Sequence, residues 1–388
     1  MPTRVAVNDR KATRARRHGL LWVTRDDSSP HPYLVASARR AGETVREIHW
    51  AVPQDGERSF GRFVELGGHN GREHPMSIKA VSPRLLREFA RAPEDVLVIY
   101  ELGLVGLYAG LSKLVRRHKV VSLVEGDYRH LGRTGSAQLK VAVRRFAARF
   151  VDAFVANSVP ARDYLVRTLN VDADRIVVGW WLAGLPDDLV PRRPDAPATR
   201  DGGPLFVTAG RLIPQKGFDL LIRALATYRR EFGPCALWII GDGPERDALV
   251  ELATRLDMRE EISFLGTVDH EALKGAFETC DAFVFPTLQD FVGRVAVEAL
   301  TAGAPIVISP MTGAVGTIVH DGVNGIVADP RDARALARAM RRAVDPLTAR
   351  ALREGVQRLN APLRPDAAAE VILGAVAMAR AGSARAQE

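Results

Sequence analysis

Cysteine and aromatic residues are scarce in this sequence, and long uncharged apolar runs are absent. Only Cys235 and Cys280 occur among the 388 residues, which excludes a small disulfide-stapled scaffold and is typical of a reducing compartment. The most apolar window, 96–115, contains Glu101 and Lys113, whereas a membrane span needs about 20 consecutive apolar residues. The composition therefore predicts no membrane-spanning helix.

The first 18 residues are basic but are not followed by the apolar stretch of a secretory signal. Their cations are Arg4, Arg10, Lys11, Arg14, Arg16 and Arg17. We expect residues 1–18 to form a flexible arm, either a solvated tail or a contact for an anionic lipid or substrate. The expected location is the cytoplasm, with peripheral attachment at the inner face of a membrane as a further option.

Positive charge is in excess, since 54 Lys and Arg residues stand against 46 Asp and Glu and the pI is near 9.8. This excess suggests an anionic partner, such as nucleic acid, anionic lipid or a phosphorylated substrate. Nucleic acid is disfavoured, because the basic residues are spread along the chain, aromatic residues make up only 6% and no nucleic-acid-binding motif occurs. The nine histidines and two cysteines show no metal-ligand spacing, so no metal is expected.

Short apolar runs alternate with helical patterns through the first half of the chain. Strands are predicted at 20–24, 45–50, 95–100, 119–124 and 153–157, and helices at 33–41, 104–117 and 139–150. Alternating strands and helices predict an α/β fold with a parallel sheet. Unbroken apolar strands indicate that helices cover both faces of that sheet.

Proline and glycine interrupt the alternation between residues 184 and 204, and a second α/β series follows. The interruption is typical of a linker between domains. Strands are then predicted at 205–209, 236–240, 262–265, 282–285 and 305–309, and helices at 218–232, 245–256, 270–280, 294–302, 331–344 and 366–381.

The predicted fold is α/β, with two Rossmann-like doubly wound domains facing a cleft. Its predicted parts are a basic arm (1–18), an N-terminal domain (19–184), a linker (185–204), a C-terminal domain (205–362) and a C-terminal helix with a tail (363–388). We expect that last helix to pack back on the N-terminal domain. Open parallel sheets bind ligands outside the carboxyl ends of their strands, so the cleft is the expected site.

A basic loop, Gly210-Arg211-Leu212-Ile213-Pro214-Gln215-Lys216-Gly217, directly follows the strand at 205–209. Glycine lets the backbone turn at the strand end. Arg211 and Lys216 would then lie at the mouth of the cleft, where a guanidinium and an ammonium can hold a diphosphate. Cations are unfavourable at the positive end of a helix dipole, so an anionic ligand explains them better than a solvated basic pair.

An acid-x7-acid motif, Asp290 to Glu298, links the strand at 282–285 to the helix at 294–302. The carboxylate of Glu298 lies one turn into the helix, where it can accept hydrogen bonds from a vicinal diol such as a ribose. Its neighbours are apolar, and a buried carboxylate needs a partner. Two simpler interpretations stay open: Asp290 caps the helix, and Glu298 is a solvated acid.

The start of the same helix offers backbone donors. The first-turn amides of Gly293, Arg294 and Val295 suit a phosphate or sugar oxygen. Earlier in this domain, Gly241-Asp242-Gly243-Pro244 indicates a turn that leads into a helix. The end of the strand at 262–265 continues into Gly266-Thr267-Val268, whose main-chain groups either hold a nucleotide base or form a simple strand exit.

In their order and spacing, five motifs resemble the retaining glycosyltransferases of family four (glycosyl transferases group 1), which have the GT-B fold. The resemblance covers residues 203–345 and is weak in the N-terminal half. Each motif alone is common, but five in order are specific. They are Gly210-Arg211…Lys216-Gly217, Gly241-Asp242-Gly243-Pro244, Phe264-Leu265-Gly266, Asp290-x7-Glu298-Ala299 and Asp321-Gly322-Val323-Asn324-Gly325.

The resemblance implies a hexosyltransferase that moves a sugar from a UDP- or GDP-linked donor to a saccharide or lipid-linked acceptor. Such a reaction belongs to the synthesis of polysaccharide, glycolipid or glycoconjugate. It implies retention of anomeric configuration and no cofactor or divalent metal, because cationic side chains neutralise the leaving phosphate. Arg211, Lys216 and Asp290 would be catalytic; Gly210, Gly266, Val268, Gly293, Arg294, Val295 and Glu298 would bind the donor.

The sequence departs from the family pattern where the sugar and acceptor are bound. Asp290 replaces the first glutamate of the motif, and Glu125-Gly126-Asp127 stands where many members carry a histidine. We expect Glu125 or Asp127 to line the acceptor or sugar pocket, with a strand-end turn as the alternative. For the whole protein, an inactive sugar-nucleotide sensor is the main alternative to a transferase.

The helix at 139–150 is basic and amphipathic. Its cations are Lys140, Arg144, Arg145 and Arg149, and its apolar residues are Leu139, Val143, Phe146 and Phe150. A helix of this kind either lies on an anionic membrane surface or is a surface helix that turns its apolar side to the core. An anionic membrane is therefore a candidate partner beside the donor and the acceptor.

Overall fold

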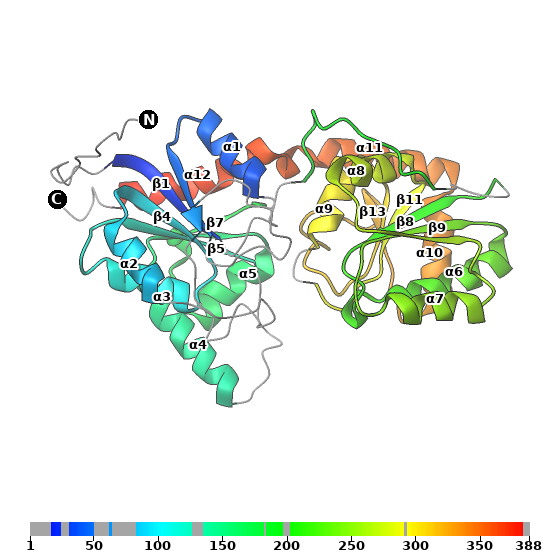
Figure 1. Cartoon of the computed structure of the whole chain (residues 1–388), viewed down its shortest axis with the longest axis horizontal. Coiled ribbons are helices and arrows are strands. Elements are labelled where there is room, and N and C mark those ends of the chain that lie inside the picture. The colour runs from blue at the N-terminus through cyan, green and yellow to red at the C-terminus, as the bar shows by residue number, and fades with distance from the viewer. Residues whose placement is uncertain are drawn as a thin grey trace, which may run out of the picture.

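A computed structural model describes residues 17–24, 31–49, 62–63, 83–125, 135–181, 184–196, 202–290 and 293–382 of the chain. Within these residues the molecule has two lobes, each built around one parallel sheet with helices on both faces (Figure 1). The likeness between the lobes follows from the repeated strand–helix alternation, because buried parallel strands need helical crossovers.

The described strands of the N-terminal lobe form one parallel sheet in the order β3-β2-β1-β4-β5-β6-β7. Its strands are β1 (Arg17–Thr24), β2 (Val45–His49), β3 (Arg62–Phe63), β4 (Glu94–Tyr100), β5 (Lys119–Val124), β6 (Ala153–Ala156) and β7 (Ile176–Val178). Its helices are α1 (His31–Arg40), α2 (Pro83–Arg91), α3 (Leu104–Ser112), α4 (Gly135–Ala148) and α5 (Val159–Asp163), the last continued by a π-helical turn at Tyr164–Thr168.

The C-terminal lobe has the strand order β10-β9-β8-β11-β12-β13. These strands are β8 (Leu205–Ala209), β9 (Ala236–Ile240), β10 (Ile262–Gly266), β11 (Ala282–Phe285), β12 (Ile306–Ile308) and β13 (Gly325–Val327). The helices are α6 (Phe218–Phe232), α7 (Arg246–Arg255), α8 (His270–Thr279), α9 (Arg294–Thr301), α10 (Ala333–Ala343) and α11 (Pro346–Leu359).

The last helix, α12 (Pro365–Ala381), returns to the N-terminal lobe (Figure 1). There Arg380 pairs with Glu43 at 2.7 Å and with Asp95 at 2.9 Å. A Cβ at Gly179 would overlap Val371 of α12 at 2.8 Å, so the helix lies against the end of β7. The two lobes therefore share a core cluster that includes Trp181 between them.

The stretch between the lobes is held to the C-terminal lobe where the structure describes it. Buried Lys274 of α8 donates to the carbonyl oxygens of Pro186, Asp187 and Leu189 at 2.7–3.2 Å. Three hydrogen bonds satisfy all the donors of an ammonium group. A proline-rich segment with few apolar residues is thus fixed by its backbone carbonyls.

Several elements differ from the sequence prediction. The predicted helix at 104–117 ends at Ser112, where Lys113 N–H turns back to the Gly110 carbonyl and the last turn tightens. Helices α2 and α11 and strand β13 were not predicted, although the apolar residues of α2 recur at helical spacing; β13 has only three residues. No helix in the described part of the chain is long and apolar enough to cross a bilayer.

Candidate active site

The topology places two loops of the C-terminal lobe side by side. Strands β8 and β11 pair in the middle of the sheet, and the strand order reverses between them. Open α/β sheets bind ligands at such a switch point, outside the carboxyl ends of the strands. The loops after these strands, 210–217 and 286–293, carry all three residues predicted to be catalytic, together with Gly210 and Gly293.

Lys216 and Asp290, far apart in sequence, meet at this point. The Lys216 ammonium donates to one carboxylate oxygen of Asp290. The other oxygen accepts the Gly293 amide at 2.9 Å, so Asp290 also anchors the start of α9. The ammonium lies 5.5 Å from the Phe285 ring centroid, a favourable cation–π distance. Both the catalytic and the structural interpretations of Asp290 are compatible with these contacts.

Glycine shapes both loops at points of close backbone approach. Gly217 has φ +65° after the 3₁₀ turn η4 (Pro214–Lys216), and a Cβ there would overlap the Pro286 carbonyl oxygen. Gly293 has φ +71°, and a Cβ there would come within 2.5 Å of the Phe285 ring. Only glycine adopts such positions without strain. Gly217 and Gly293 therefore allow the two loops to pack this closely.

The Gly241–Pro244 motif supports the basic loop from behind. The Leu212 amide donates to the Asp242 carbonyl at 2.9 Å, and the Gly210 amide to Ile240 at the same distance. A Cβ at Gly241 would overlap the Gly210 carbonyl oxygen. These contacts are structural, and Gly210, which was predicted to bind the donor, already uses its amide in the bond to Ile240.

Arg211 lies on the same loop with an exposed side chain. In the described part of the chain, the side chain of Arg211 forms neither a hydrogen bond nor an ion pair. Its cationic group is therefore available to an anion, whereas Lys216 is held by Asp290. A diphosphate at this loop would meet one pre-oriented ammonium and one adaptable guanidinium.

Glu298 is buried in the first turns of α9. Burial raises the pKa of its carboxyl, and the charge of Arg294, whose Nε lies 3.4 Å from Glu298 Oε1, opposes that shift. The solvated-acid interpretation is wrong, because the side chain is enclosed. Arg294 and Val295 are the first two helical residues, and their amides have no acceptor within the helix.

The remaining predicted donor contacts lie on β10 and just beyond it. Gly266 ends β10 with φ +67°, and its carbonyl accepts the Gly241 amide at 2.7 Å. Val268 packs against the shared core cluster, as does Val295. Both valines are half-buried, and these contacts leave the base-binding interpretation open.

Glu125 brings the N-terminal lobe into the site. It follows β5, and its amide donates to Glu101 Oε1 at 2.9 Å. Burial, then the charges of Glu101 and Asp290, raise the pKa of Glu125 to about 7, against a smaller opposing effect of Arg294. Two groups of the C-terminal lobe thus lie within electrostatic reach of this carboxyl. Asp127 lies outside the described residues.

Two groups near the site were not predicted. Glu101 follows β4 with φ +59°, a conformation that costs a non-glycine residue about 1–3 kcal/mol and that often occurs at functional sites. Its position in an otherwise apolar window was the available sequence signal. His270 begins α8, where burial and the charge of Arg294 lower its pKa; no sequence pattern pointed to it.

The Asp321–Gly325 motif forms a turn. Buried Asn324 donates to the Ile318 carbonyl and accepts the His320 amide, both at 2.7 Å. The Gly322 amide closes the turn on the Gly325 carbonyl at 2.8 Å. This turn begins β13 and therefore contributes to the edge of the sheet.

Residues 191–354 match the family described as glycosyl transferases group 1. The chain therefore contains a glycosyltransferase group 1 domain. In the solved structures, the fold resembles that of HepE from Anabaena in complex with UDP and glucose, with a TM-score of 0.71 and 18% identity over 93% of this chain and 100% of the other. The fold is GT-B, as predicted.

Curated relatives align with this chain over very different shares of its length. An uncharacterised glycosyltransferase of Methanocaldococcus jannaschii is 34% identical over 145 residues, which are 37% of each chain. The alignment thus spans little more than a third of that relative. A GDP-mannose-dependent α-(1-6)-phosphatidylinositol monomannoside mannosyltransferase of Mycolicibacterium smegmatis is 29% identical over 77% of this chain and 82% of its own length.

Proposed function

We propose that this protein is a retaining, metal-independent glycosyltransferase of family four that transfers a hexosyl group from a nucleotide sugar to an acceptor hydroxyl. The observation that carries the proposal is the meeting of Lys216 with Asp290 at the switch point, beside Arg211. Cations at the carboxyl end of a parallel sheet suit a diphosphate leaving group. The glycosyltransferase group 1 domain supports the same reading.

In this proposal Arg211 and Lys216 bind the diphosphate and stabilise the charge that develops as the bond from C1 of the sugar to phosphate breaks. Asp290 holds Lys216 in place and contacts the sugar hydroxyls. Glu298 accepts hydrogen bonds from the ribose diol, for which its enclosed carboxylate next to Arg294 is suited. Buried carboxylates bind hydroxyl donors strongly, because no water competes for them.

The acceptor oxygen then forms the new bond to C1, and its proton passes to the departing phosphate on the same face of the sugar. No protein nucleophile is required, unlike in the two-carboxylate mechanism of most retaining glycosidases. Glu125 lines the sugar or acceptor pocket. Because its pKa is near 7, its carboxyl can donate a hydrogen bond to a substrate oxygen when protonated and accept one when ionised.

The proposed classes of donor and acceptor are supported by the names of the similar proteins. We propose a UDP- or GDP-linked hexose, since the HepE structure holds UDP and glucose and the M. smegmatis relative is named for GDP-mannose. A saccharide or lipid-linked acceptor fits the phosphatidylinositol mannoside in that name. The proposed location is cytoplasmic, at the inner face of a membrane.

A screen of UDP-, GDP- and ADP-sugars without added metal tests the donor site. We expect one nucleotide class to raise the Tm and to be hydrolysed slowly. The shift should disappear in Arg211→Ala and in Glu298→Ala. The matched control is Glu251→Ala, which removes the acid of another i,i+4 Glu–Arg pair, on α7. No response to any sugar nucleotide would contradict the proposal.

The sensor alternative makes a different prediction for the same variants. A sensor would bind a sugar nucleotide without hydrolysis or transfer, and Lys216→Ala would change only its affinity. An enzyme would lose turnover by far more than it lost affinity, because a contact to the leaving group is strongest in the transition state. Comparing kcat with the donor Kd in this variant separates the two.

A further inference from the structure

Helices α3 and α4 of the N-terminal lobe expose an apolar surface to solvent. This surface lies outside the group 1 domain. Leu114 is 83% exposed and Val115 72%, in the turn after α3. Leu139 and Phe146 of α4 are 63% and 47% exposed. With Leu111 at 38%, these five residues make up what we call the α3–α4 surface. Contiguous exposed apolar patches usually mark interaction sites.

Helix α4 exposes two large apolar side chains, Leu139 and Phe146, that the sequence allowed to face the core. Leu139 and Phe146 lie two turns apart on one face, and that face points to solvent. Arg144, which the sequence grouped with the surface cations, is buried, and its guanidinium donates to the Tyr164 hydroxyl at 3.3 Å. The helix does have an apolar core face, but Val141, Ala147 and Ala148 form it, while Leu139 and Phe146 stay outside it.

The two helices form one rigid unit. A Cβ at Gly110 of α3 would overlap the Phe150 side chain at 2.8 Å, and one at Gly106 would touch Ala147 at 3.6 Å. Phe150 in turn holds Phe146 in an edge-to-face contact, with the ring centroids 5.2 Å apart. The exposed phenyl ring of Phe146 is thus pre-oriented, and the surface needs little ordering when it binds a partner.

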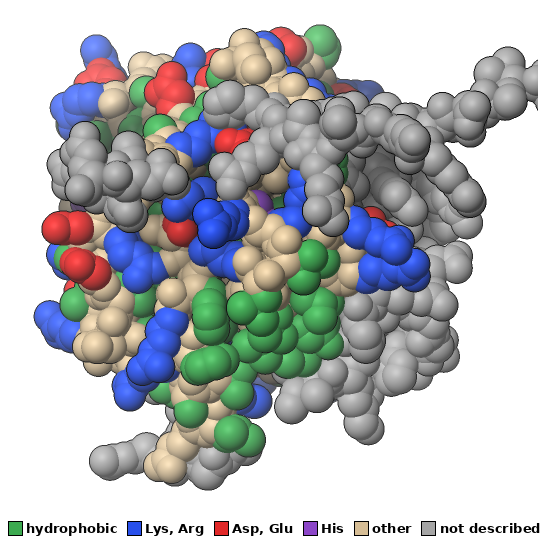
Figure 2. All heavy atoms as spheres, turned by 90° about the vertical axis from the view of Figure 1, so that its left-hand side faces the viewer, with side chains coloured by type: hydrophobic (Ala, Val, Ile, Leu, Met, Phe, Trp, Pro, Cys, Tyr) green, Lys and Arg blue, Asp and Glu red, His purple; other side chains and the backbone are tan. Residues whose placement is uncertain are grey.

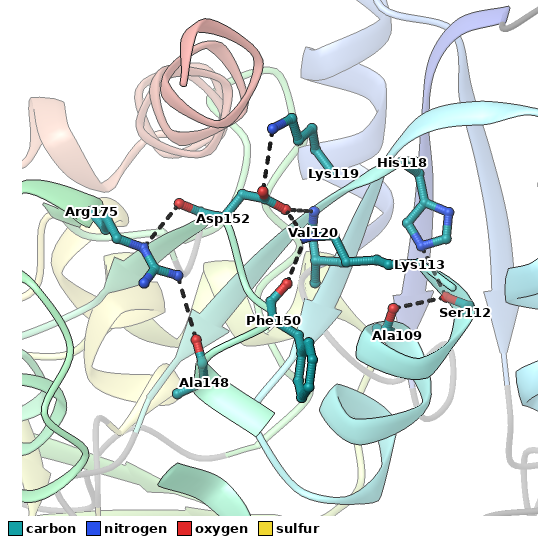
Figure 3. A network of polar contacts seen from close by, with 10 residues as sticks. All are labelled: Ala109, Ser112, Lys113, His118, Lys119, Val120, Ala148, Phe150, Asp152 and Arg175. Carbon is teal, nitrogen blue, oxygen red and sulfur yellow. Dashed lines mark hydrogen bonds and ion pairs between the residues drawn. The ribbon is translucent and has the colours of Figure 1, made fainter. Parts of the chain in front are cut away.

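A polar network behind the surface fixes the ends of both helices (Figure 3). Lys113 donates to the Phe150 carbonyl at 2.7 Å and to Asp152 at 2.6 Å. Asp152 also accepts the Val120 amide at 2.8 Å and pairs with Lys119. These two lysines are therefore committed to internal contacts, and they leave the apolar side chains of the following turn outside the network.

His118 closes the same network on the α3 side (Figure 3). Its Nε2 lies 2.9 Å from Ser112 Oγ, and that hydroxyl donates to the Ala109 carbonyl. The hydroxyl has one hydrogen, so His118 is the donor in their bond. Burial lowers the pKa of His118 to about 4, so the imidazole is neutral at ordinary pH and the surface keeps its shape there.

The two chain segments that form this surface carry charges of one sign only. Residues 102–124 and 135–151 contain no aspartate or glutamate. The cations that these segments present at the molecular surface are Arg116, Arg117, Lys140, Arg145 and Arg149. Figure 2 shows the hydrophobic band on this face with Lys and Arg side chains along its margins. An apolar band with a cationic margin matches the interior and the headgroups of an anionic bilayer.

We propose that the α3–α4 surface docks this protein on an anionic lipid bilayer, with Leu114, Val115 and Leu139 inserted among the acyl chains and the flanking cations on the headgroups. A second copy of the chain fits less well, because two such surfaces would bring like charges together. The inference rests on the proposed function: residue 135, the first of α4, follows Glu125 by ten residues, so a docked surface lies one connection away from the acceptor side.

Vesicle co-sedimentation of the full chain tests the proposal. The probes are vesicles of phosphatidylcholine alone and of phosphatidylcholine with an equal part of phosphatidylglycerol. We expect binding to the anionic vesicles only. The double variant Leu114→Glu/Val115→Glu should lower vesicle binding by at least about tenfold. It removes apolar groups that would enter the bilayer and adds charges that the anionic lipids repel. Lys140→Gln should lower vesicle binding about fivefold, the worth of one cation near the surface.

Leu347→Glu is the matched control, because Leu347 on α11 is 82% exposed and lies on the other lobe. It should bind vesicles as the wild type does. Equal binding by the wild type and the Leu114→Glu/Val115→Glu variant would overturn the proposal, as would no binding to either vesicle. A wild-type dimer that becomes monomeric in this variant would assign the surface to a second copy instead.

The donor screen keeps the two proposals apart. A folded Leu114→Glu/Val115→Glu variant should keep the Tm shift with its sugar nucleotide while it loses vesicle binding. Vesicle binding without any donor response would leave the surface supported and the transferase proposal contradicted.

Discussion

In the C-terminal lobe the chain leaves β8 and β11 through loops shaped by Gly217 and Gly293; in the N-terminal lobe it leaves β4 and β5 at Glu101 and Glu125. The first arrangement relies on backbone positions that exclude side chains and on an ion pair. The second relies on two neighbouring carboxyl groups, of which that of Glu125 is desolvated. The same topology therefore offers one preorganised cationic site and one carboxyl site whose charge changes near neutral pH.

This contrast also explains why sequence reasoning worked better in one lobe. Glycines with positive φ and a fixed acid-x7-acid spacing are local constraints, so their motifs could be recognised directly. Glu101 has its role only because β4 and β5 are neighbours, and Arg144 is buried only because Tyr164 lies opposite. Such contacts depend on the packing of distant segments, which periodicity does not encode.

The largest effect should come from breaking the cationic site. Lys216→Ala should lower kcat about 10²–10³-fold, because a fixed donor to the leaving group is lost. Lys216→Arg, which keeps the charge, should recover part of the rate. Asp290→Asn should add little to Lys216→Ala in the double variant, since the two residues act as a unit. Independent, multiplying losses in steady-state kinetics would contradict the pairing.

Glu125→Gln tests the carboxyl site through pH. The folded pKa of about 7 lies above the ordinary 4.5, so the native state holds the proton more tightly between these values. Wild-type stability should then fall as the pH rises through this window, by about 3 kcal/mol. The glutamine variant should lack this fall, so denaturant unfolding should show the two proteins diverging from pH 4.5 to 8. Parallel curves would refute the assignment.

Gly217→Ala and Gly266→Ala form a matched pair, because their φ angles are +65° and +67°. Both variants bear the strain of a left-handed alanine, about 1 kcal/mol. Only Gly217→Ala also drives a Cβ into a carbonyl oxygen, whereas nothing lies within 4 Å at Gly266. We expect the unfolding free energy of Gly217→Ala to be about 1–3 kcal/mol lower than that of Gly266→Ala. Equal losses would show that the two loops can move apart.

The smallest effect concerns the segment between the lobes. Lys274→Met removes the donor to three backbone carbonyls and should lower stability by about 1–2 kcal/mol, since water can replace part of those bonds. Hydrogen exchange should rise in residues 184–196 and stay unchanged in the loop 210–217. Faster exchange in that loop would mean that the segment supports the site directly.

The return of α12 to the N-terminal lobe has a consequence for recombining such proteins. The chain passes between the lobes twice, and the two passages touch, since the Gly184 amide donates to the Leu363 carbonyl at 3.0 Å. A chimaera that exchanges donor specificity therefore needs two junctions, one near each of these residues. A single junction would pair α12 of one parent with the sheet of another and leave Arg380 without Glu43 and Asp95.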